Sequence, residues 1–237
     1  EMQQISIATP GLFDKGDVFY IDLTTIGHKN FAFPLPVGKS KAIGGDVLEI
    51  TTQKGDAVKA MLPGRVRLAR KNKQWGNVVV IRHDNGLETV YAHNAQNLVK
   101  PNQMVEAGQS IAIVGTKSGK GRMALLTMVN GGRINPLTII DANNHKLHKT
   151  VLRFEKKGHR VLVRQATEKD LEEKLLAEKK AKEDEKKARK EEEKAKKEEA
   201  KRLKEEEKML ADEKKANEKT LLKPQKSGKN NSGNKLV

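Results

Sequence analysis

The sequence contains no cysteine, few aromatic residues and no long uninterrupted apolar run. Without cysteine the chain forms no disulfide, so its fold depends on non-covalent packing. A helix that crosses a membrane needs about 20 mostly apolar residues, and no such stretch is present, so we expect no transmembrane segment. Aromatic residues make up 3% of the chain, and all of them lie before position 155.

Residues beyond position 155 have little apolar surface to bury, so burial there cannot offset the conformational entropy lost on folding. The composition therefore indicates one globular region followed by a non-globular tail. The last part of this non-globular region, residues 219–237, is rich in Lys, Asn, Gly and Ser and is expected to be disordered. We divide the chain into an N-terminal extension (1–30), a β-domain (31–141), an additional hairpin or connection (142–166), a charged helix (167–218) and a basic tail (219–237).

The positive charge, formally +16, is distributed unevenly. Residues 1–150 carry 19 Lys or Arg against 11 Asp or Glu, whereas residues 168–219 carry 19 of each. A basic folded surface favours an anionic partner such as peptidoglycan, an anionic lipid surface or nucleic acid. Nucleic acid is not expected, because neither interleaved aromatic residues nor a known binding motif accompanies the charge. The basic tail favours peripheral contact with a membrane.

Short β-rich runs separated by glycine, asparagine and proline fill residues 47–140 and indicate an all-β sandwich or barrel. One more strand is expected at 18–23 and a hairpin at 151–166, while the Gly/Lys-rich stretch 37–45 is expected to be a turn. The strands expected in between are Val47–Thr52, Val58–Ala60, Gly64–Ala69, Val78–Arg82, Glu88–Tyr91, Ser110–Val114, Ala124–Val129 and Leu137–Ile140.

From Thr167 to about Glu218 the chain is mostly Glu, Lys, Arg and Ala, without glycine or proline. Thr167 is expected to cap this helix, with acidic residues in its first turn. Alanine recurs every seven residues, but the positions that would complete a coiled-coil seam are glutamates, which favours a solvated single helix over a coiled coil. Glu–Lys and Glu–Arg pairs four residues apart contribute about 0.3 kcal/mol each. The expected pairs are Glu178–Lys182, Glu183–Lys187, Glu185–Arg189, Glu192–Lys196 and Glu193–Lys197.

The most informative stretch is residues 76–93, GNVVVIRHDNGLETVYAH. Its two β-rich runs flank an Asp-Asn-Gly turn and predict a hairpin that ends at His93, with His83 exposed before the turn. Three more glycine-marked stretches accompany it, at 55–66, 105–115 and 131–136. In this order and spacing the four stretches resemble the LytM/lysostaphin-type zinc endopeptidases, which cut peptidoglycan cross-links. The resemblance covers about residues 31–140 and implies a mainly β fold, a small β-sandwich or barrel of the LytM-like type.

The resemblance also implies a zinc ion held by a His-x-x-x-Asp pair and a His-x-His pair. In this sequence the corresponding positions are Gly45, Glu49, Ala124 and Leu126. Only Glu49, or Asp46 if the register slips, offers a ligand atom, whereas a catalytic zinc needs three protein ligands. The resemblance thus implies a degenerate metallopeptidase homologue, a pseudoenzyme whose zinc site is lost and which uses no cofactor.

His93 matches a second-sphere catalytic histidine of that family and is vestigial here, because without zinc there is no activated water for it to act on. His145 and His148 are spaced to bind a metal weakly, but with no third ligand nearby we expect them in a solvated loop. The face left by the lost chemistry is expected to bind a partner. The candidate residues of this partner groove are Asp46, Glu49, Tyr91, His93 and Arg122.

Several functions follow from these patterns. The first is a non-catalytic LytM-like module of the bacterial cell envelope that binds a protein or peptidoglycan, as a murein-hydrolase activator or regulator. The alternatives are a structural subunit of a periplasmic or outer-membrane complex, with the charged helix as a spacer, and a residual metallo-endopeptidase. A biotinyl or lipoyl carrier is disfavoured because Lys59 lies within a strand pattern. The chain begins at Glu1, and we expect a periplasmic or cell-surface protein from which an export signal has been removed.

Overall fold

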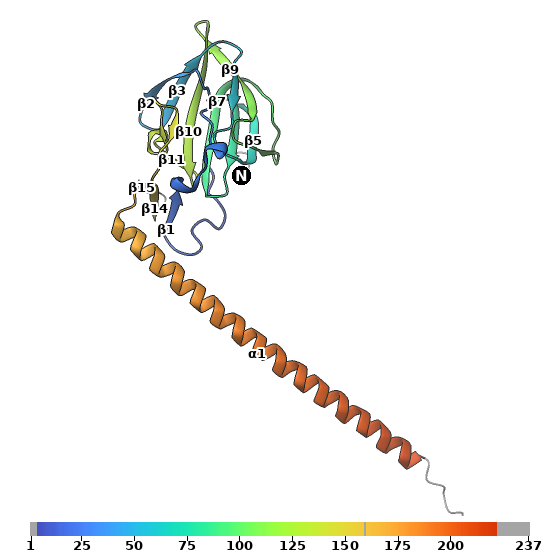
Figure 1. Cartoon of the computed structure of the whole chain (residues 1–237). Helices are drawn as coiled ribbons and strands as arrows, with labels where there is room; N and C mark the ends of the chain where they lie inside the picture. Colours follow the sequence, from blue (N-terminus) through green and yellow to red (C-terminus); the bar gives the residue numbers. More distant parts are fainter. Residues whose placement is uncertain (1–3, 159, 222–237) are drawn as a thin grey trace, which may run out of the picture. The chain divides into compact units, whose positions relative to one another are not determined.

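The computed structural model of the chain describes residues 4–158 and 160–221 (Figure 1). The chain divides after Leu171 into two compact units. The first unit is mainly β, as predicted, and the second contains most of one long helix. The domain boundaries drawn from composition stay a prediction, and the expected disorder of the tail concerns residues that lie almost wholly outside the described ones.

Strands dominate the first unit, with three short 3₁₀ helices between them. The strands are β1 (Val18–Asp22), β2 (Lys39–Ile43), β3 (Val47–Thr52), β4 (Ala57–Lys59), β5 (Gly64–Asn72), β6 (Gly76–Arg82), β7 (Leu87–Asn97), β8 (Met104–Val105), β9 (Ser110–Lys117), β10 (Lys120–Val129), β11 (Gly132–Ile134), β12 (Ile140–Asp141), β13 (Lys146–Leu147), β14 (Val151–Lys157) and β15 (Arg160–Gln165). The helices are η1 (Leu23–Thr25), η2 (His28–Asn30), η3 (Pro136–Thr138) and α1 (Glu168–Leu221).

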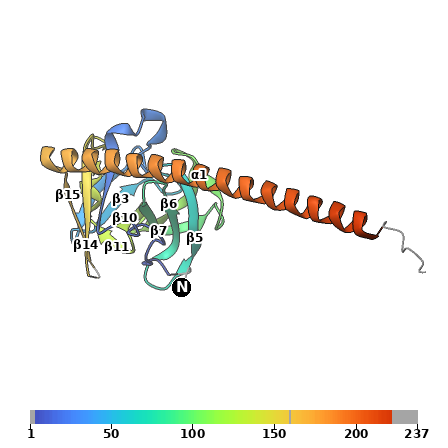
Figure 2. The same ribbon diagram turned by 90° about the horizontal axis from the view of Figure 1, so that it is seen from below.

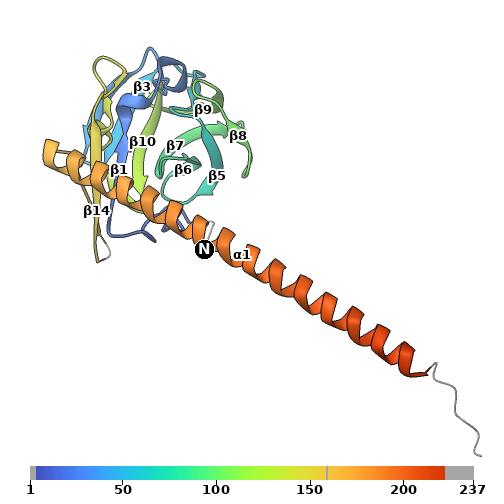
Figure 3. The same ribbon diagram turned by 60° about the horizontal axis from the view of Figure 1, so that its bottom comes forward.

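The main sheet is ten-stranded, in the order β2-β3-β10-β9-β7-β6-β5-β8, with β4 paired to β9 and β11 to β10. All of its pairings are antiparallel, and β10 also pairs with β7, so that β3, β10, β7, β6 and β5 follow one another across the sheet. Figure 3 shows β10, β7, β6 and β5 in this succession. A separate three-stranded sheet, β1-β14-β15, joins the beginning of the chain to the hairpin predicted at 151–166.

Both faces of the main sheet are buried around β6, which explains why this strand reads VVVI rather than alternating. Val79 and Ile81 face the larger core, whereas Val78 and Val80 face a smaller apolar cluster on the other side. A strand buried on both faces loses the polar positions that would otherwise mark its exposed side. The smaller cluster consists of Leu68, Val78, Val80, Val90, Ala92, Ala124, Leu126 and Met128, with Ile5, Val47 and Trp75 packed against it.

Three local predictions were wrong. The expected turn at 37–45 contains β2, because only the Gly44–Gly45 end turns, and the residues before it pair with β3. The strand expected at Leu137–Ile140 begins instead as η3, since Pro136 favours a first helical turn and the Asn135 side chain accepts a hydrogen bond from the Leu137 N–H. The strand expected at Glu88–Tyr91 continues past His93 to Asn97 beyond a bulge.

The prediction that His83 is exposed was also wrong, since its side chain is 4% exposed. Its Nδ1 lies 2.7 Å from the Pro63 carbonyl oxygen and its Nε2 lies 2.9 Å from Thr89 Oγ1. Thr89 Oγ1 in turn lies 3.0 Å from the Tyr91 hydroxyl, which accepts a hydrogen bond from the Met61 N–H. These contacts satisfy polar groups within the larger core, so the histidine is a structural residue rather than a surface one.

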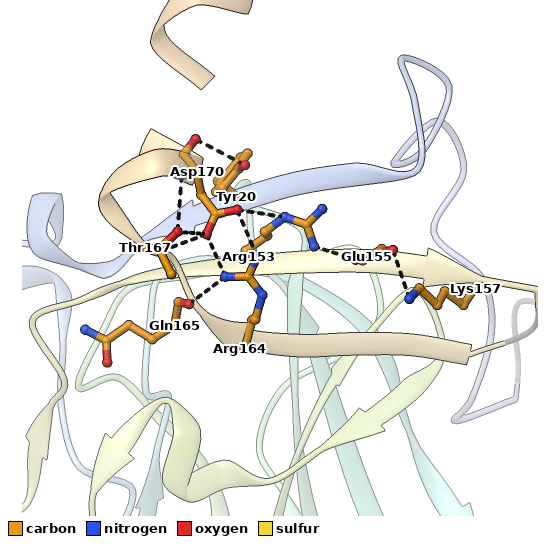
Figure 4. Close-up of polar contacts among 8 residues, drawn as sticks. All are labelled: Tyr20, Arg153, Glu155, Lys157, Arg164, Gln165, Thr167 and Asp170. Atoms are coloured by element: carbon orange, nitrogen blue, oxygen red, sulfur yellow. Dashed lines mark hydrogen bonds and ion pairs between the residues drawn. The ribbon is translucent and has the colours of Figure 1, made fainter. Parts of the chain in front are cut away.

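Helix α1 begins where its predicted cap lies. Thr167 and Asp170 form a reciprocal cap, in which the Thr167 N–H donates to the Asp170 carboxylate and the Asp170 N–H donates to Thr167 Oγ1. The Asp170 carboxylate also accepts hydrogen bonds at 2.6 and 2.8 Å from the Arg164 guanidinium, and it pairs with Arg153 (Figure 4). Tyr20 donates a hydrogen bond to the Asp170 carbonyl. The first helical turn is thereby tied to β1, β14 and β15.

Helix α1 is uninterrupted over its 54 residues (Figure 2). Three of the expected pairs form, namely Glu183–Lys187, Glu192–Lys196 and Glu193–Lys197, and Lys174–Glu178 adds another. The prediction of a long charged helix is confirmed. None of the helices in residues 4–158 and 160–221 is long and apolar enough to cross a membrane.

The contacts of the Asp170 carboxylate predict that the first turn of α1 loses stability at low pH. The neighbouring Arg164 guanidinium and the Thr167 hydrogen bonds hold the pKa of the Asp170 carboxyl well below its ordinary value of 3.8. Because the folded-state pKa is lowered, this contribution to stability is complete above 3.8 and is lost as the pH falls through the lowered pKa. We expect Asp170→Asn to speed amide exchange at Leu171, measured by NMR, whereas Glu168→Gln in the same turn leaves it unchanged. Equal exchange in the two variants would contradict the assignment.

Candidate functional site

The cross-strand register brings three of the four predicted ligand positions onto one face of the main sheet. Glu49 lies opposite Ala124 in the β3–β10 pairing, and Ala124 also lies opposite Ala92 of β7. Leu126 follows Ala124 by two residues and shares its face, because side chains alternate along a strand. We call the face that carries Glu49, Ala124 and Leu126 the site face. The fourth position, Gly45, is exposed in the turn between β2 and β3.

Both candidate carboxylates of this region are engaged by arginine. Arg122 Nε lies 3.0 Å from Glu49 Oε2, with the two side chains 19% and 26% exposed. Arg133 Nη1 lies 3.2 Å from Asp46 Oδ2 across a more exposed gap. The structure therefore places the Asp46 and Glu49 carboxylates in ion pairs, with Arg133 and Arg122 respectively. A carboxylate neutralised in this way is a poor metal ligand.

His93 occupies a strained position next to these pairs. It lies at a β-bulge of β7 with a φ of 62°, a left-handed conformation that is uncommon for residues other than glycine. Its N–H donates to the Trp75 carbonyl at 2.7 Å, and a Cβ on Gly115 would lie 1.9 Å from the His93 carbonyl oxygen. Bulges of this kind redirect a side chain out of the regular alternation.

The electrostatic surroundings favour neutral His93 at pH 7. Partial burial lowers the pKa of His93, and the positive charge of Arg122 lowers it further, whereas Glu49 opposes them. The ring borders a cavity of about 220 Å³ that is lined by His93, Thr116, Lys117 and Arg122. The cavity therefore presents two cations beside an uncharged imidazole.

Trp75 and Arg133 lie beside His93 but were not singled out from the sequence. We call Trp75, Arg133, Arg122 and His93 together the rim of the site face. The Trp75 ring lies 5.6 Å from the His93 ring, and the Arg133 guanidinium lies 5.2 Å from the centre of the Trp75 ring. A cation at this distance over an indole contributes roughly 0.5–1 kcal/mol at an exposed site. Trp75 is the only tryptophan in the chain, and that rarity was the available signal.

Tyr91 does not belong to the proposed groove, which corrects the prediction. Its side chain is fully buried in the larger core, on the opposite face of β7 from Val90 and Ala92. The strand's two-residue period would have placed it there. His145 and His148, which were expected in a solvated loop, both contact other residues. The His145 ring stacks 4.0 Å from the Phe33 ring, and His148 Nε2 lies 3.0 Å from the Leu137 carbonyl oxygen.

The residues present do not fit the zinc ion that the family resemblance implies. Ala124 and Leu126 are buried within the smaller apolar cluster, 3% and 0% exposed, and neither has a ligand atom. Gly45 has no side chain, and Glu49 is paired with Arg122. Within the part of the chain that the structure describes, no group of three His, Cys, Asp or Glu side chains is placed to hold a metal. We therefore derive no chemical step through a metal.

An N-terminal segment, residues 4–9, lies against the same side of the sheet. Arg67 donates hydrogen bonds to the Gln4 and Ile5 carbonyls at 2.8 and 2.6 Å. Ile5 packs on the smaller apolar cluster, and the Thr9 N–H donates to Asn130 Oδ1. This cover was not predicted, because nothing local in residues 4–9 indicates contacts more than 60 positions away.

Introducing the four zinc ligands of the family tests whether positions 45, 49, 124 and 126 are the ones that correspond to them. The φ of Gly45 is +85°, which disfavours histidine, and a histidine in place of buried Leu126 brings a polar ring into an apolar cluster. We expect the quadruple variant Gly45→His, Glu49→Asp, Ala124→His, Leu126→His to fold with a lower melting temperature and to bind zinc weakly, because partners that orient the new imidazoles are missing. Calorimetry with zinc is the measurement, and tight binding at one ion per chain would contradict this account.

The comparison with known families defines the class of this domain. Residues 46–136 match the family model described as Peptidase family M23. The matched segment runs from the β2–β3 turn to the start of η3 and so contains the whole site face. Residues 46–136 therefore match a LytM-type domain, and the resemblance predicted from the sequence is confirmed.

Particular relatives are murein hydrolase activators. The chain is 39% identical over 89 residues to the murein hydrolase activator EnvC of Escherichia coli (strain K12), covering 37% of this chain and 21% of EnvC. It is 35% identical over 96 residues to the murein hydrolase activator NlpD of Salmonella dublin, covering 40% of this chain and 26% of NlpD. The chain thus spans about a quarter or less of the length of these relatives. Among solved structures, lysostaphin of Staphylococcus simulans is similar with a TM-score of 0.42 and 21% identity, covering 47% of this chain and 52% of that one.

Proposed function

We propose that this chain is a non-catalytic binding module of the bacterial cell envelope that activates or regulates murein hydrolases by binding a protein partner or peptidoglycan. The proposal is supported by the murein hydrolase activators among its relatives. It implies an extracytoplasmic location, where murein lies. It also implies that the domain works as a pseudoenzyme, without zinc.

The observation that carries the proposal is the state of the site face. Two positions that should hold zinc, Ala124 and Leu126, contribute apolar side chains to a buried cluster instead. Burial of a leucine side chain stabilises a fold by about 1.5–3 kcal/mol, so this face contributes to stability where a catalytic domain would keep polar ligands. A scaffold that retains its strand register without the ligands suits binding rather than hydrolysis.

The rim of that face, which is half-buried except at exposed Arg133, offers the means of binding. Trp75, Arg133, Arg122 and His93 lie together and combine an indole surface with guanidinium donors. Tryptophan and arginine are the residue types most enriched among those that dominate binding energy at protein interfaces. An acidic or mixed-charge partner surface fits this rim better than a basic one.

Release of dye from labelled peptidoglycan tests the activity. We expect the purified chain alone to release none, with or without a chelator, and to increase release by a murein hydrolase from the same organism. Arg122→Glu should raise the concentration needed for half-maximal stimulation about tenfold, equivalent to about 1.4 kcal/mol. Arg160→Glu, an equal change of charge at an exposed position on β15, should leave it unchanged. Chelator-sensitive release by the chain alone would refute the proposal.

A second candidate function is that of a structural subunit whose helix acts as a spacer. It is favoured by the 54-residue helix, whose balanced charges and i,i+4 pairs stabilise it without a partner. Co-purification of the full chain and of a version that ends at Glu178, which keeps the Asp170 contacts, separates the two. A spacer role predicts that the shortened chain loses partners, whereas an activator that binds through the site face keeps them.

A further inference from the structure

A second cavity, away from the His93 rim, is built from arginine side chains and the N-terminal segment. Its volume is about 510 Å³, within the range of small-molecule sites in proteins. One wall is formed by residues 9–12 and the other by the ends of β5 and β6. The charged side chains that line it are Arg65, Arg67, Arg82 and Asp84.

The arginines lie in a cross-strand row with too few carboxylates. Arg65 of β5 is directly opposite Arg82 of β6, and Arg82 is opposite Glu88 of β7. Like charges directly opposite one another destabilise a sheet. Glu88 accepts hydrogen bonds from both Arg67 and Arg82, whereas the Arg65 guanidinium donates a hydrogen bond to the neutral Asn102 carbonyl, at 3.1 Å. With Asp84 included, three guanidinium groups meet two carboxylates, which leaves one excess positive charge.

Two polar atoms of the lining residues are buried without a hydrogen-bond partner among the described residues. They are Nη2 of Arg82 and Oγ1 of Thr9. Such groups are rare in folded proteins, and a buried donor without an acceptor costs about 1–3 kcal/mol. Both belong to side chains at the same cavity, one on each wall. An acceptor oxygen bound in the cavity offers these groups the kind of partner they lack, and the Arg82 side chain, 25% exposed, is accessible to a ligand.

We propose that Arg65, Arg82 and Thr9 form a binding pocket for the carboxylate of a small, partly apolar ligand such as a short peptide. A guanidinium group binds a carboxylate through two parallel hydrogen bonds. A single excess positive charge matches a monoanion, whereas a phosphate group carries about −1.5 to −2 at pH 7 and would meet Asp84 as well. Leu12 supplies apolar contact for the remainder of the ligand.

This pocket is distinct from the rim proposed to bind a partner. On β7, Glu88, which lies opposite Arg82, precedes Ala92, the neighbour of His93, by four residues, and a rise of about 3.3 Å per residue separates the two positions by about 13 Å. The inference does not depend on the proposed function, because it rests on charge, burial and register around Arg65 and Arg82. A ligand here would also contact residues 9–12 and so hold the N-terminal segment in place.

An NMR titration of the full-length, ¹⁵N-labelled chain tests the pocket with three probes. These are N-acetyl-alanyl-alanine with a free carboxylate, the same dipeptide as its carboxamide, and inorganic phosphate. We expect saturable shifts of the amides around the pocket, including Leu12 and Gly86, with the free carboxylate. The carboxamide should cause no saturable shift, and phosphate should bind more weakly than the carboxylate.

Two variants distinguish the pocket from general attraction to a basic protein. Arg65→Gln should weaken binding of the carboxylate dipeptide at least tenfold, because it removes a charge-assisted hydrogen bond while leaving the Glu88 pairs intact. Lys71→Gln removes the same charge from an exposed position on the same strand and should change the affinity less than twofold. Absence of saturable binding, equal binding of the carboxamide, phosphate binding as tight as carboxylate binding, or equal effects of the two variants would each overturn the proposal.

Discussion

Replacement of Glu88 by alanine is expected to lower the free energy of unfolding by about 3–5 kcal/mol, measured by urea denaturation. The Glu88 side chain is fully buried, and its carboxylate accepts hydrogen bonds from Arg67 at 2.7 and 2.9 Å and from Arg82 at 2.8 Å. The Arg67 side chain is itself 4% exposed. Removing the carboxylate leaves a buried guanidinium uncompensated, and that cost is a large part of the 5–15 kcal/mol that stabilises a typical domain.

Two further variants separate the loss of the buried charge pair from loss of packing. Glu49→Ala removes the carboxylate of the Glu49–Arg122 pair, which is more exposed than the Glu88 pairs. This change should cost no more than about 1 kcal/mol of unfolding free energy. The triple variant Glu88→Leu, Arg67→Met, Arg82→Met removes all three charges together and should recover most of the stability, as replacement of buried ion pairs by apolar groups often does. A triple variant as unstable as Glu88→Ala would show that shape, not charge, dominates at this position.

Acidification from pH 6.5 to pH 4 is expected to lower the free energy of unfolding by roughly 3 kcal/mol through His83 alone. Burial lowers the pKa of His83 from 6.5 to about 4. In this interval the unfolded chain binds a proton on His83 and the folded chain does not, so stability falls as the pH falls. The contribution is complete above 6.5 and is lost progressively toward 4.

Denaturant unfolding at several pH values, compared between variants, isolates this effect. His83→Gln should be less stable than the natural chain at pH 7, because the contact with the Pro63 carbonyl depends on the imidazole, but its stability should change less between pH 6.5 and 4. His28→Gln, at an exposed histidine, should keep the full slope. Identical slopes for the natural chain and His83→Gln would mean that the imidazole charges in the folded state.

The elements predicted well from the sequence are those whose signals are local. Val47–Thr52 is a strand with the predicted bounds, the Asp-Asn-Gly turn joins β6 to β7, and Thr167 caps α1. Each depends on residues within a few positions of one another, where propensity, turn chemistry and capping act. The candidate ligand positions Glu49 and Ala124 also fall side by side, because spacing along two strands determines their register.

Features that depend on distant partners could not be predicted. His83 is buried because the Pro63 carbonyl and the Thr89 hydroxyl supply hydrogen-bond partners on both sides of its ring. The Arg133 contact with Trp75 joins a residue of β11 to one in the turn between β5 and β6, and neither position has a local pattern of its own. Tyr91 is a different case. The alternation of side chains along β7 predicts that Tyr91 faces the core, whereas the family resemblance led us to place it in the partner groove.

The contact between Arg67 and the N-terminal segment is made to the main chain alone. Its guanidinium binds the carbonyl oxygens of Gln4 and Ile5, which every amino acid possesses. Mutational drift at position 4 therefore leaves this attachment intact, and position 5 needs only an apolar side chain for the cluster beneath it. Recognition of this kind depends on the path of the backbone and tolerates changes of sequence, so homologues can retain the covered face with little identity in the segment that covers it.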